Sequence, residues 1–340
     1  MPTLSASLES TLNRAWLRRG PLACALWPLS LLAGAVAAAR KRTLHVERLP
    51  VPVIVVGNIF VGGTGKTPLT IWLAEVLRAA GYTPGVVSRG HGGAAVAPRP
   101  VTADARAQEV GDEPLLIARR AGVPVMVGRR RAEAGRALLA LHPDVDVIIA
   151  DDGLQHYALG RDIEIMLFDG RGVGNGWLLP AGPLREPVSR RRDFTVVNTP
   201  ALTPELAASV GGAPFQMQLE GRFAERLGQR RERIALAELA GRRVVAAAGI
   251  GNPGRFFAML RGAGLAVDEL ALPDHHDFLD RPFAQVQADI ILITEKDAVK
   301  CGQIEHLRND PRLWVVPVTA RLDAALAEQI VEKCRGCTSA

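Results

Sequence analysis

Short apolar runs alternate with stretches of helical periodicity over residues 51–170. The run VPVIVVGNI at 51–59 has strand length and no charge, which is typical of a parallel strand covered on both faces. The segment 67–80 that follows places its leucines on one helical face and ends before Gly81. The same alternation predicts further strands at 83–88, 123–128, 144–153 and 163–170, and helices at 111–122 and 129–141.

The pattern changes after residue 170. Residues 171–193 are rich in glycine and proline and end in arginines, which is typical of a loop. The pattern is weak over 200–235, as in a linker or a small sheet between domains. Regular elements are predicted as a strand at 194–198, a strand-turn-helix unit at 242–264, strands at 288–300 and 312–318, and a helix at 322–335.

Strands and helices that alternate through short turns predict an α/β fold with a doubly wound, mostly parallel sheet. The weak stretch near residue 220 separates a second, smaller α/β domain. We predict three parts: an N-terminal hydrophobic, membrane-associating segment at 1–42, a nucleotide-binding domain at 43–220, and a second domain at 221–340 that contributes to the active-site cleft.

The N-terminal run PLACALWPLSLLAGAVAAA at 21–39 carries no charge and has basic residues on both sides. A transmembrane helix needs about 20 apolar residues, so this length is borderline. Basic flanks suit a helix that lies at an anionic membrane surface. A helix buried in the soluble domain is the alternative, and a signal peptide fits less well because charges follow directly. We predict a membrane-associated helix.

The net charge of +6 predicts an anionic partner, such as a membrane surface, a phosphorylated substrate or nucleic acid. Only 5% of the residues are aromatic and no nucleic-acid-binding module is recognisable, which argues against nucleic acid. Four cysteines in 340 residues are too few for a disulfide scaffold and indicate a reducing compartment. Cys334 and Cys337 form a single C-x-x-C without a second pair.

The segment VVGNIFVGGTGKTPLT at 55–70 ends like a phosphate-binding loop and lies between a predicted strand and a predicted helix. Its glycines let backbone N–H groups face an anion, its lysine can reach the β- and γ-phosphates, and its last threonine can ligate Mg²⁺. Phe60 stands where the general pattern has a glycine. The predicted nucleotide-binding residues are Val61, Gly62, Gly63, Thr64, Gly65, Lys66, Thr67 and Pro68.

Asp151 and Asp152 end the apolar run VIIA. In phosphate-loop enzymes an aspartate at this point holds Mg²⁺, directly or through water. Together with Thr67, these two aspartates are the predicted metal-binding residues. Two surface acids ahead of a glycine turn are the alternative.

Two other segments carry candidate catalytic groups. Asp112 and Glu113 open a helix, where the helix dipole favours acids, and that structural role is the simpler interpretation of their spacing. The segment PDHHDF at 273–278 places His275 and His276 between aspartates. A His–Asp pair can polarise a hydroxyl group. A metal site and a solvated loop remain alternatives.

The segment GIGNPGRF at 249–256 has the glycine spacing of a dinucleotide fingerprint. Pro253 removes an N–H group, however, and no well-placed ribose-binding acid is evident. We therefore predict a tight strand-to-helix turn. The segment TEKDAVK at 294–300 places Lys296 and Asp297 at the end of a strand, where open α/β sheets bind ligands.

Taken in order, these motifs resemble the tetraacyldisaccharide 4′-kinases of lipid A biosynthesis, a family of membrane-associated P-loop kinases. The resemblance covers nearly the whole chain. The family's loop has the form GGxGKTP, so Phe60 fits the family although it departs from the general pattern. The matching segments are VGNIFVGGTGKTP, SRGHGG, GDEP, ADDGLQH, FDGRGVGNGWLLPAGPLREP, PDHHDF and TEKDAVK.

The resemblance implies transfer of the ATP γ-phosphate to the 4′-hydroxyl of an acylated glucosamine disaccharide 1-phosphate, giving lipid IVA, with ATP and Mg²⁺ as cofactors. It implies that Asp112 accepts the hydroxyl proton and that His275, in preference to His276, assists it. Lys66 serves the phosphates. If Asp112 and His275 come from different domains, the reaction occurs in the cleft between them, and domain closure on ATP completes the site.

The resemblance also gives the N-terminal helix a purpose, because it holds the enzyme where a glycolipid resides. It implies the cytoplasmic face of a bacterial inner membrane, with the glycolipid and an anionic membrane surface as partners. Arg171, Asn175 and Arg185 are candidate contacts for the sugar or its 1-phosphate, with His276 as a further one. A membrane-associated switch or partitioning-type ATPase is the alternative function, but it leaves the PDHHDF segment unexplained.

Overall fold

The structure, a computed structural model, describes residues 16–93 and 97–337. The first 15 residues of the predicted N-terminal segment lie outside the described residues. The chain forms two compact units. The first contains residues up to Lys66, Val147–Gln218 and the residues from Leu322 onward, and the second contains Thr67–Asp146 and Leu219–Arg321. The predicted division at 42 and 220 stays a prediction, although the second unit resumes close to residue 220.

The first unit is built on a parallel sheet with strand order β8-β7-β6-β1-β5. Every residue of β1 is buried, as the apolar run predicts for a strand covered on both faces. In the parallel pairing of β1 with β5, Val56 lies opposite Asp151. The chain therefore leaves β1 toward the phosphate loop at the same edge of the sheet where the paired aspartates begin. The strands are β1 (Val53–Gly57), β5 (Val147–Asp151), β6 (Ile163–Asp169), β7 (Phe194–Asn198) and β8 (Phe215–Glu220).

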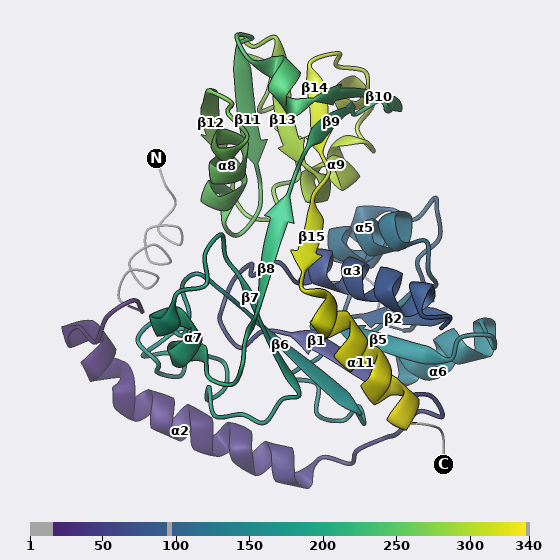
Figure 1. Cartoon of the computed structure of the whole chain (residues 1–340), viewed down its shortest axis with the longest axis vertical. Helices are drawn as coiled ribbons and strands as arrows, with labels where there is room; N and C mark the ends of the chain where they lie inside the picture. The colour runs from purple at the N-terminus through teal and green to yellow at the C-terminus, as the bar shows by residue number, and fades with distance from the viewer. Residues whose placement is uncertain (1–15, 94–96, 338–340) are drawn as a thin grey trace. The chain divides into compact units, whose positions relative to one another are not determined.

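Among the described residues of the first unit, three helices accompany this sheet, and the glycine- and proline-rich stretch 171–193 contains no helix or strand, as predicted. Figure 1 shows the long N-terminal helix as a single rod and the C-terminal helix as the yellow end of the chain. The helices are α2 (Pro21–Thr43), α7 (Pro204–Val210) and α11 (Ala324–Gly336).

In the second unit, residues 67–146 contribute the strand order β2-β4-β3 and most of the helices of the predicted nucleotide-binding domain. β2 and β4 are parallel, and the short β3 is antiparallel to β4. The elements are α3 (Lys66–Ala79), β2 (Pro84–Ser88), β3 (Arg99–Pro100), α4 (Ala107–Val110), α5 (Asp112–Ala121), β4 (Val125–Val127) and α6 (Arg131–Leu141).

The remaining part of the second unit holds a six-stranded sheet with the order β10-β9-β14-β13-β11-β12. The last four strands in this order are parallel, and β9 and β10 add an antiparallel edge. Residues 200–235, where the sequence pattern is weak, thus include the two antiparallel strands β9 and β10 at the edge of this sheet. The elements are β9 (Phe223–Arg226), β10 (Gln229–Ala235), η1 (Leu236–Leu239), β11 (Val244–Ala248), α8 (Pro253–Gly262), β12 (Val267–Ala271), β13 (Ile290–Thr294), α9 (Glu295–Cys301), α10 (Glu305–Arg308) and β14 (Leu313–Val316). The short strand β15 (Thr319–Leu322) follows and is not part of this sheet.

Alternate residues of the central strand β13 enter two separate hydrophobic clusters. Ile290 and Leu292 belong to one cluster with the phenylalanines of α8, and Ile291 and Ile293 belong to another with Ala298 of α9. Because successive side chains of a strand point to opposite faces, both faces of this sheet are covered. The prediction of a mixed α/β chain with a second α/β part is therefore confirmed.

The prediction of a strand over 288–300 is wrong in its second half. β13 ends at Thr294, and the motif TEKDAVK forms α9 instead. The Thr294 hydroxyl accepts a hydrogen bond from the backbone N–H of Asp297 at 3.2 Å, which caps the helix. A threonine followed three residues later by an acid is a helix-start signal that outweighs the preceding apolar run.

The buried carboxylate of Asp297 also organises the glycine-rich turn between β11 and α8. Its Oδ2 accepts hydrogen bonds from the Gly249 backbone N–H at 3.1 Å and from the Thr294 hydroxyl at 2.6 Å. A Cβ at Gly249 would lie 3.0 Å from the other carboxylate oxygen and 3.2 Å from the Pro273 carbonyl oxygen. No side chain larger than hydrogen fits at Gly249 without displacing these atoms, and the segment is the predicted tight turn between β11 and α8.

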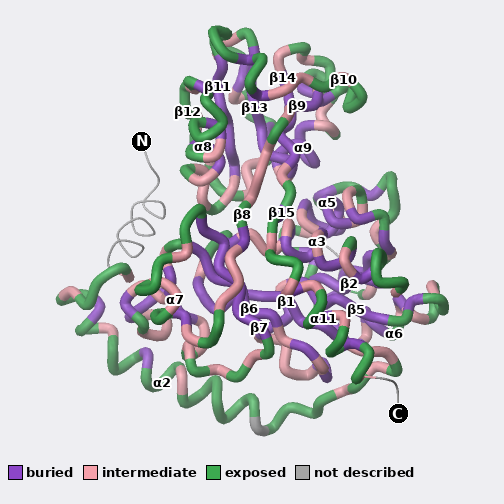
Figure 2. The backbone as a smooth tube through the Cα atoms, viewed as in Figure 1, coloured by how far each residue is buried: buried purple, intermediate pink, exposed green. Residues whose placement is uncertain are grey.

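Helix α2 exposes most of its apolar surface, which Figure 2 shows as a nearly continuous green rod. Over Pro21–Lys41 it is long and apolar enough to cross a membrane, with a mean hydropathy of 1.9 and 11% of its most apolar window buried. The alternative of a helix buried in the soluble domain therefore does not hold. Ala23 and Ser30 are buried, and the Ser30 hydroxyl donates to the Leu178 carbonyl at 2.8 Å and accepts from the Ala181 N–H at 2.9 Å.

The network around Asp297 predicts a stability effect. Asp297→Ala leaves the buried N–H of Gly249 and the Thr294 hydroxyl without their acceptor, so the free energy of unfolding should fall by about 2 kcal/mol. Chemical denaturation followed by circular dichroism measures this difference. Asp268→Ala, at an exposed position on β12, is the control and should be neutral. Equal stability of both variants would contradict the assigned role of Asp297.

Candidate active site

The phosphate loop lies between β1 and α3, as predicted, and is held by a buried asparagine. Nδ2 of Asn58 donates to the carbonyl oxygens of Phe60 at 2.7 Å and Gly62 at 3.2 Å. Oδ1 of Asn58 accepts from Lys66 Nζ at 3.3 Å. One side chain therefore fixes both the course of the loop and the position of its lysine.

Two glycines of the loop are required by backbone conformation. Gly62 and Gly65 have φ values of 101° and 100°, which side-chain-bearing residues rarely adopt. A Cβ at Gly65 would also lie 2.3 Å from Nδ2 of Asn198, a group that donates to the Thr64 carbonyl at 2.9 Å. Asn198, at the end of β7, thus closes the loop from the side and leaves room only for glycine at position 65.

The paired aspartates lie beside the loop lysine. Lys66 Nζ is 3.5 Å from Asp152 Oδ1, and Arg185 Nη1 is 3.9 Å from the same oxygen. That oxygen is buried and accepts no hydrogen bond within residues 16–93 and 97–337, while Asp151 is 1% exposed at the end of β5. Carboxylate oxygens that are not committed to hydrogen-bond donors are the ligands that Mg²⁺ prefers. This Asp152 oxygen therefore fits the metal that the sequence predicts.

Asp112 and His275 form a pair inside the second unit. Nδ1 of His275 is 3.1 Å from Oδ2 of Asp112, and Oδ1 of Asp112 accepts from the Glu113 N–H at 2.9 Å. Asp112 is the first residue of α5, and it is 4% exposed. The loop residue His275 is held by a hydrogen bond from its own N–H to the Gly249 carbonyl at 3.2 Å. Because both residues belong to one compact unit, the pair does not require the predicted cleft between two domains.

Two lysines of α9 complete this cluster. Lys300 Nζ lies 3.4 Å from Asp112 Oδ2. Lys296 Nζ lies 3.1 Å from Glu113 Oε1, 3.4 Å from His275 Nε2 and 3.7 Å from Asp274 Oδ1. The two lysines are four residues apart and so project from the same side of the helix. The cluster therefore combines one His–Asp pair with two ammonium groups.

The neighbours of Asp112 and His275 shift both of their pKa values. Burial alone would raise the pKa of the Asp112 carboxyl, but the hydrogen bond from His275 and the charges of Lys296, His275 and Lys300 outweigh it and lower the pKa to about 2. The hydrogen bond with Asp112 raises the pKa of His275, against burial and the charge of Lys296. Asp112 is therefore ionised at any physiological pH, and His275 titrates above its ordinary pKa.

His276 has a different environment from its neighbour. Its Nδ1 accepts from the Phe278 N–H at 3.0 Å, and its Nε2 lies 3.3 Å from Asp280 Oδ2. Candidate ligand atoms of His276, Asp277 and Asp280 lie within 4.8 Å of one another, but the two aspartates are exposed, and such acidic groups commonly gather without an ion. The alternative of a metal site in PDHHDF thus does not involve His275.

The three other predicted substrate contacts separate into two kinds. Asn175 is buried, with Nδ2 donating to the Ala181 carbonyl at 2.9 Å and Oδ1 accepting from the Trp177 N–H at 3.0 Å, so its amide organises the loop. Arg185 lies beside Asp152, as described above. The Arg171 guanidinium forms a two-point ion pair with Asp169 next to the phosphate loop.

Comparison with known proteins supports one assignment. The family model for tetraacyldisaccharide-1-phosphate 4′-kinase matches residues 22–335. The chain belongs to this family. It is 62% identical to the tetraacyldisaccharide 4′-kinase of Janthinobacterium sp. (strain Marseille) over 342 residues, and 61% identical to that of Herminiimonas arsenicoxydans over 351 residues, with 97% of each chain covered in both cases.

A solved structure agrees with these relatives. The crystal structure of LpxK from Aquifex aeolicus in complex with ATP is 30% identical, covers 92% of this chain and 99% of its own, and superposes with a TM-score of 0.74. The resemblance read from the motifs is thus confirmed, and the chain is an enzyme of the kinase class.

Some functional side chains have no local sequence signal. Asn58 and Asn198 stand inside or at the end of apolar strands, where a polar residue is a weak signal of a buried anchor. Lys300 lies in the TEKDAVK motif, but its pairing with Asp112 joins residues 188 positions apart and depends on how α5 packs on α9. Only the tertiary structure brings these groups together.

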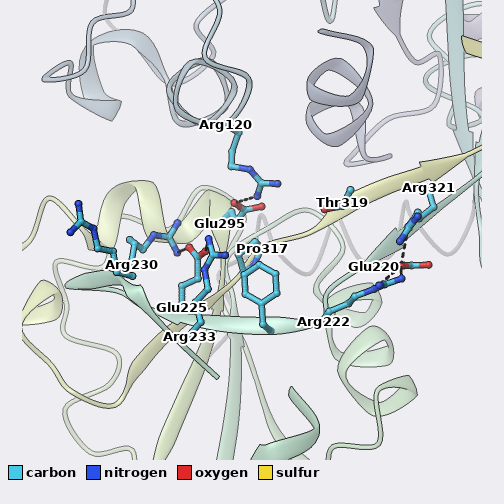
Figure 3. A pocket seen from close by; sticks show the side chains of 12 residues that line it. Arg120, Glu220, Arg222, Glu225, Arg230, Arg233, Glu295, Pro317, Thr319 and Arg321 are labelled. Carbon is cyan, nitrogen blue, oxygen red and sulfur yellow. Dashed lines mark hydrogen bonds and ion pairs between the residues drawn. The ribbon is translucent and has the colours of Figure 1, made fainter. Parts of the chain in front are cut away.

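A second cluster of charges lines a pocket of about 710 Å³ in the second unit, shown in Figure 3. Its arginines are largely matched to three glutamates: Arg120 pairs with Glu295, and Arg233 lies 2.8 Å from Glu225. None of the predicted catalytic residues lines this pocket. Its charged residues are Arg120, Glu220, Arg222, Glu225, Arg230, Arg231, Arg233, Glu295 and Arg321.

The Asp112–His275 pair predicts a measurable titration. Asp112→Asn removes the carboxylate that raises the pKa of His275, so His275 should titrate at a lower pH than in the native protein. The ring-proton resonances of His275 in NMR spectra, recorded as a function of pH, measure this change. Asp268→Asn, a change at an exposed position of the same unit, is the control and should not alter the pKa of His275. An unaltered His275 titration in Asp112→Asn would contradict the pairing.

Proposed function

We propose that this chain transfers the γ-phosphate of ATP to the 4′-hydroxyl of tetraacyldisaccharide 1-phosphate, forming lipid IVA. The observation that carries the proposal is the Asp112–His275 pair with its two lysines, in a chain that also has a complete phosphate loop. An alcohol acceptor needs a group that takes its proton, and the Asp112–His275 pair provides one; a switch ATPase activates water instead and uses no glycolipid acceptor. The ATP complex of the Aquifex aeolicus relative supports ATP as the phosphate donor.

The phosphate loop would bind the nucleotide through residues 61–68. The N–H groups around Gly62 and Gly65 face the phosphates, and Lys66 is already held near the loop by Asn58. Thr67, Asp151 and Asp152 would hold Mg²⁺. That ion, when bound, neutralises charge on the β- and γ-phosphates.

The Asp112–His275 pair would receive the hydroxyl proton. The Asp112 carboxylate is buried, and both of its oxygens already have donors, from Glu113 on one side and from His275 and Lys300 on the other. The His275 side chain is 33% exposed and that of Asp112 is 5% exposed, so His275 is the more accessible member of the pair. Asp112 then holds the proton on Nδ1 and stabilises the imidazolium that forms, as a carboxylate does in other His–Asp pairs.

Lys296 would have a different task in the same cluster. Its ammonium group lies 3.4 Å from His275 Nε2, which is the atom that faces the acceptor hydroxyl in this proposal. Burial would lower the pKa of Lys296, but the charges of Glu113, Asp112 and Asp274 raise it, so the ammonium group stays charged. It can therefore neutralise negative charge next to the reacting oxygen.

We also propose that α2 lies along the membrane surface. Ala23, Ser30 and Gly34 share one face of the helix and contact the protein over about 16 Å, at 1.5 Å per residue. A membrane crossing would remove Ser30 from the backbone groups of the 178–181 segment that it bonds. Leu29, Leu32 and Val36 project from the opposite side and are 54%, 62% and 51% exposed, so this side would enter the lipid.

Phosphoryl transfer tests the catalytic proposal. With ATP, Mg²⁺ and the disaccharide 1-phosphate, Asp112→Asn and His275→Ala should each lower kcat by about 10²- to 10⁴-fold, because each removes part of the proton acceptor. If His275 must be neutral, the native rate rises with pH through the raised pKa of His275, and this limb moves to lower pH in Asp112→Asn. A native rate that is flat from pH 5 to pH 9 would instead assign the proton to Asp112. Equal ATP consumption without the glycolipid would support the switch ATPase.

Vesicle binding tests the role of α2. The triple change Leu29→Gln, Leu32→Gln and Val36→Gln removes apolar area from its free side, so binding to phosphatidylethanolamine–phosphatidylglycerol vesicles should weaken at least about 10-fold. Cosedimentation measures this binding. Leu141→Gln, at a similarly exposed leucine of α6, is the control. The native protein should be released from membranes by alkaline carbonate, and retention would indicate a helix that spans.

A further inference from the structure

Phe60, the residue that departs from the general phosphate-loop pattern, supports an arginine. The phenyl ring is buried at 4% exposure, and the guanidinium carbon of Arg171 lies 4.2 Å from the ring centroid. This distance is typical of a cation–π contact, in which the ring face attracts the cation. The glycine of the general pattern could not provide this surface. The unusual residue therefore has a specific contact in the structure.

A buried carboxylate sets the orientation of the same guanidinium. Arg171 Nε lies 3.0 Å from Asp169 Oδ1, and Nη2 lies 2.8 Å from Oδ2. Asp169 ends β6 and is 2% exposed, so it belongs to the rigid sheet. Two parallel hydrogen bonds fix a planar guanidinium in both position and angle. The guanidinium group of Arg171 thus stacks on the ring of Phe60 and is hydrogen-bonded to the carboxylate of Asp169.

This arrangement leaves Nη1 directed at the phosphate loop. A Cβ at Gly62 would lie 3.7 Å from Arg171 Nη1 and 3.9 Å from Nη2. Nη1 makes no hydrogen bond to any residue that the structure describes, in contrast to Nε and Nη2. Gly62 stands four residues before Lys66, in the part of the loop that wraps the β- and γ-phosphates. A donor placed here faces the terminal phosphate of a bound nucleotide.

We propose that Arg171 is a catalytic residue that contacts the terminal phosphoryl group of the bound nucleoside triphosphate, with Phe60 and Asp169 as its positioning residues. The proposal rests on the nucleotide site of the proposed function and differs from the expectation that Arg171 contacts the sugar or its 1-phosphate. In the transfer step, the bond from the γ-phosphorus to the β–γ bridging oxygen breaks and a bond to the acceptor oxygen forms. The electron pair stays on the ADP oxygen, and the hydroxyl proton goes to the Asp112–His275 pair.

A guanidinium group at this position would stabilise negative charge on the transferred phosphoryl group. The transferred phosphoryl group is loosely bound to both oxygens in the transition state, and its equatorial oxygens carry negative charge. A donor that is already fixed before the nucleotide binds needs no reorganisation during the reaction. In other phosphate-loop enzymes an arginine supplied by the same chain or by a partner stabilises this charge. Here the chain itself would supply it from the end of β6.

Nucleotide binding tests this role without any glycolipid. In the presence of Mg²⁺, calorimetry compares ADP with ADP plus fluoroaluminate, which imitates the transferred phosphoryl group. Arg171→Ala should weaken the fluoroaluminate complex by about 10²- to 10³-fold, and ADP binding should change by less than about 3-fold. Arg171→Lys should lose most of the same effect, because lysine keeps the charge but not the two-point pairing with Asp169.

The supporting residues provide a graded series. Phe60→Leu keeps an apolar side chain of similar size but removes the ring face, and Asp169→Asn weakens the fixed orientation. Both should weaken the fluoroaluminate complex by about 5- to 50-fold while ADP binding persists. Arg48→Gln, which removes an exposed arginine paired with Asp162, is the control and should change neither ligand. Retained ADP binding shows that each variant is folded.

Two results would overturn the proposal. One is an unchanged preference for fluoroaluminate in Arg171→Ala. The other is a raised KM for the disaccharide 1-phosphate in that variant with unaltered nucleotide binding, which would return Arg171 to the sugar or its 1-phosphate. If the native protein binds ADP and fluoroaluminate through Arg171 but phosphorylates no glycolipid, the proposed substrate fails while the role of Arg171 stands.

Discussion

A carboxylate taken out of water needs hydrogen-bond donors or opposite charges, because an unpaired buried charge costs several kcal/mol. Three buried aspartates accept such contacts near the candidate sites, although burial raises the pKa of the Asp297 carboxyl and one of its oxygens has no hydrogen-bond partner among the described residues. Asp112 takes donors from His275 and Lys300, Asp169 takes the guanidinium of Arg171, and Asp297 takes the Gly249 N–H. All three are at most 4% exposed. Each therefore fixes the segment that supplies its donors.

The consequence is that, within each unit, the flexible parts of the candidate sites are tied to rigid elements. The loop that carries His275 is irregular, and His275 itself has a φ of 59°. Its ring is nevertheless bonded to the first residue of α5, and its N–H to Gly249, which directly follows β11. Arg171 follows β6 directly and is bonded back to it. Groups held in this way lose little freedom when a ligand binds, which is the condition for electrostatic catalysis by preorganised charges.

The phosphate loop shows the same principle with neutral groups. Asn58 and Asn198 bond backbone carbonyls of the loop, and Gly65 is confined by Asn198. Phe60 contributes to the same loop, because its ring packs against the guanidinium group of Arg171. The phenylalanine at position 60 and the buried amides of Asn58 and Asn198 therefore all hold the phosphate loop in the same conformation.

The local pattern predicted most elements because burial and period are local properties. The run at 51–59 became β1, the 67–80 helix became α3, and the GIGNPG turn was recognised from its proline. The error at 288–300 has the same origin, because an apolar strand signal continued into a motif whose threonine caps a helix. Motif spacing also predicted the residues of the phosphate loop, and the family resemblance predicted both members of the Asp112–His275 pair.

By itself, the sequence determined the α/β class, the family and the types of chemical group available, since these depend on composition, periodicity and motif order. It left the helix dipole as the simpler explanation of Asp112, and it preferred His275 to His276 only through the family resemblance. Only the tertiary structure showed that His275 reaches Asp112 and that His276 bonds Asp280. It alone placed Lys300 on Asp112 and Arg171 over Phe60. Apart from the contact of His276 with Asp280, these pairings join residues more than 100 positions apart, and no local pattern records which distant element will pack against which.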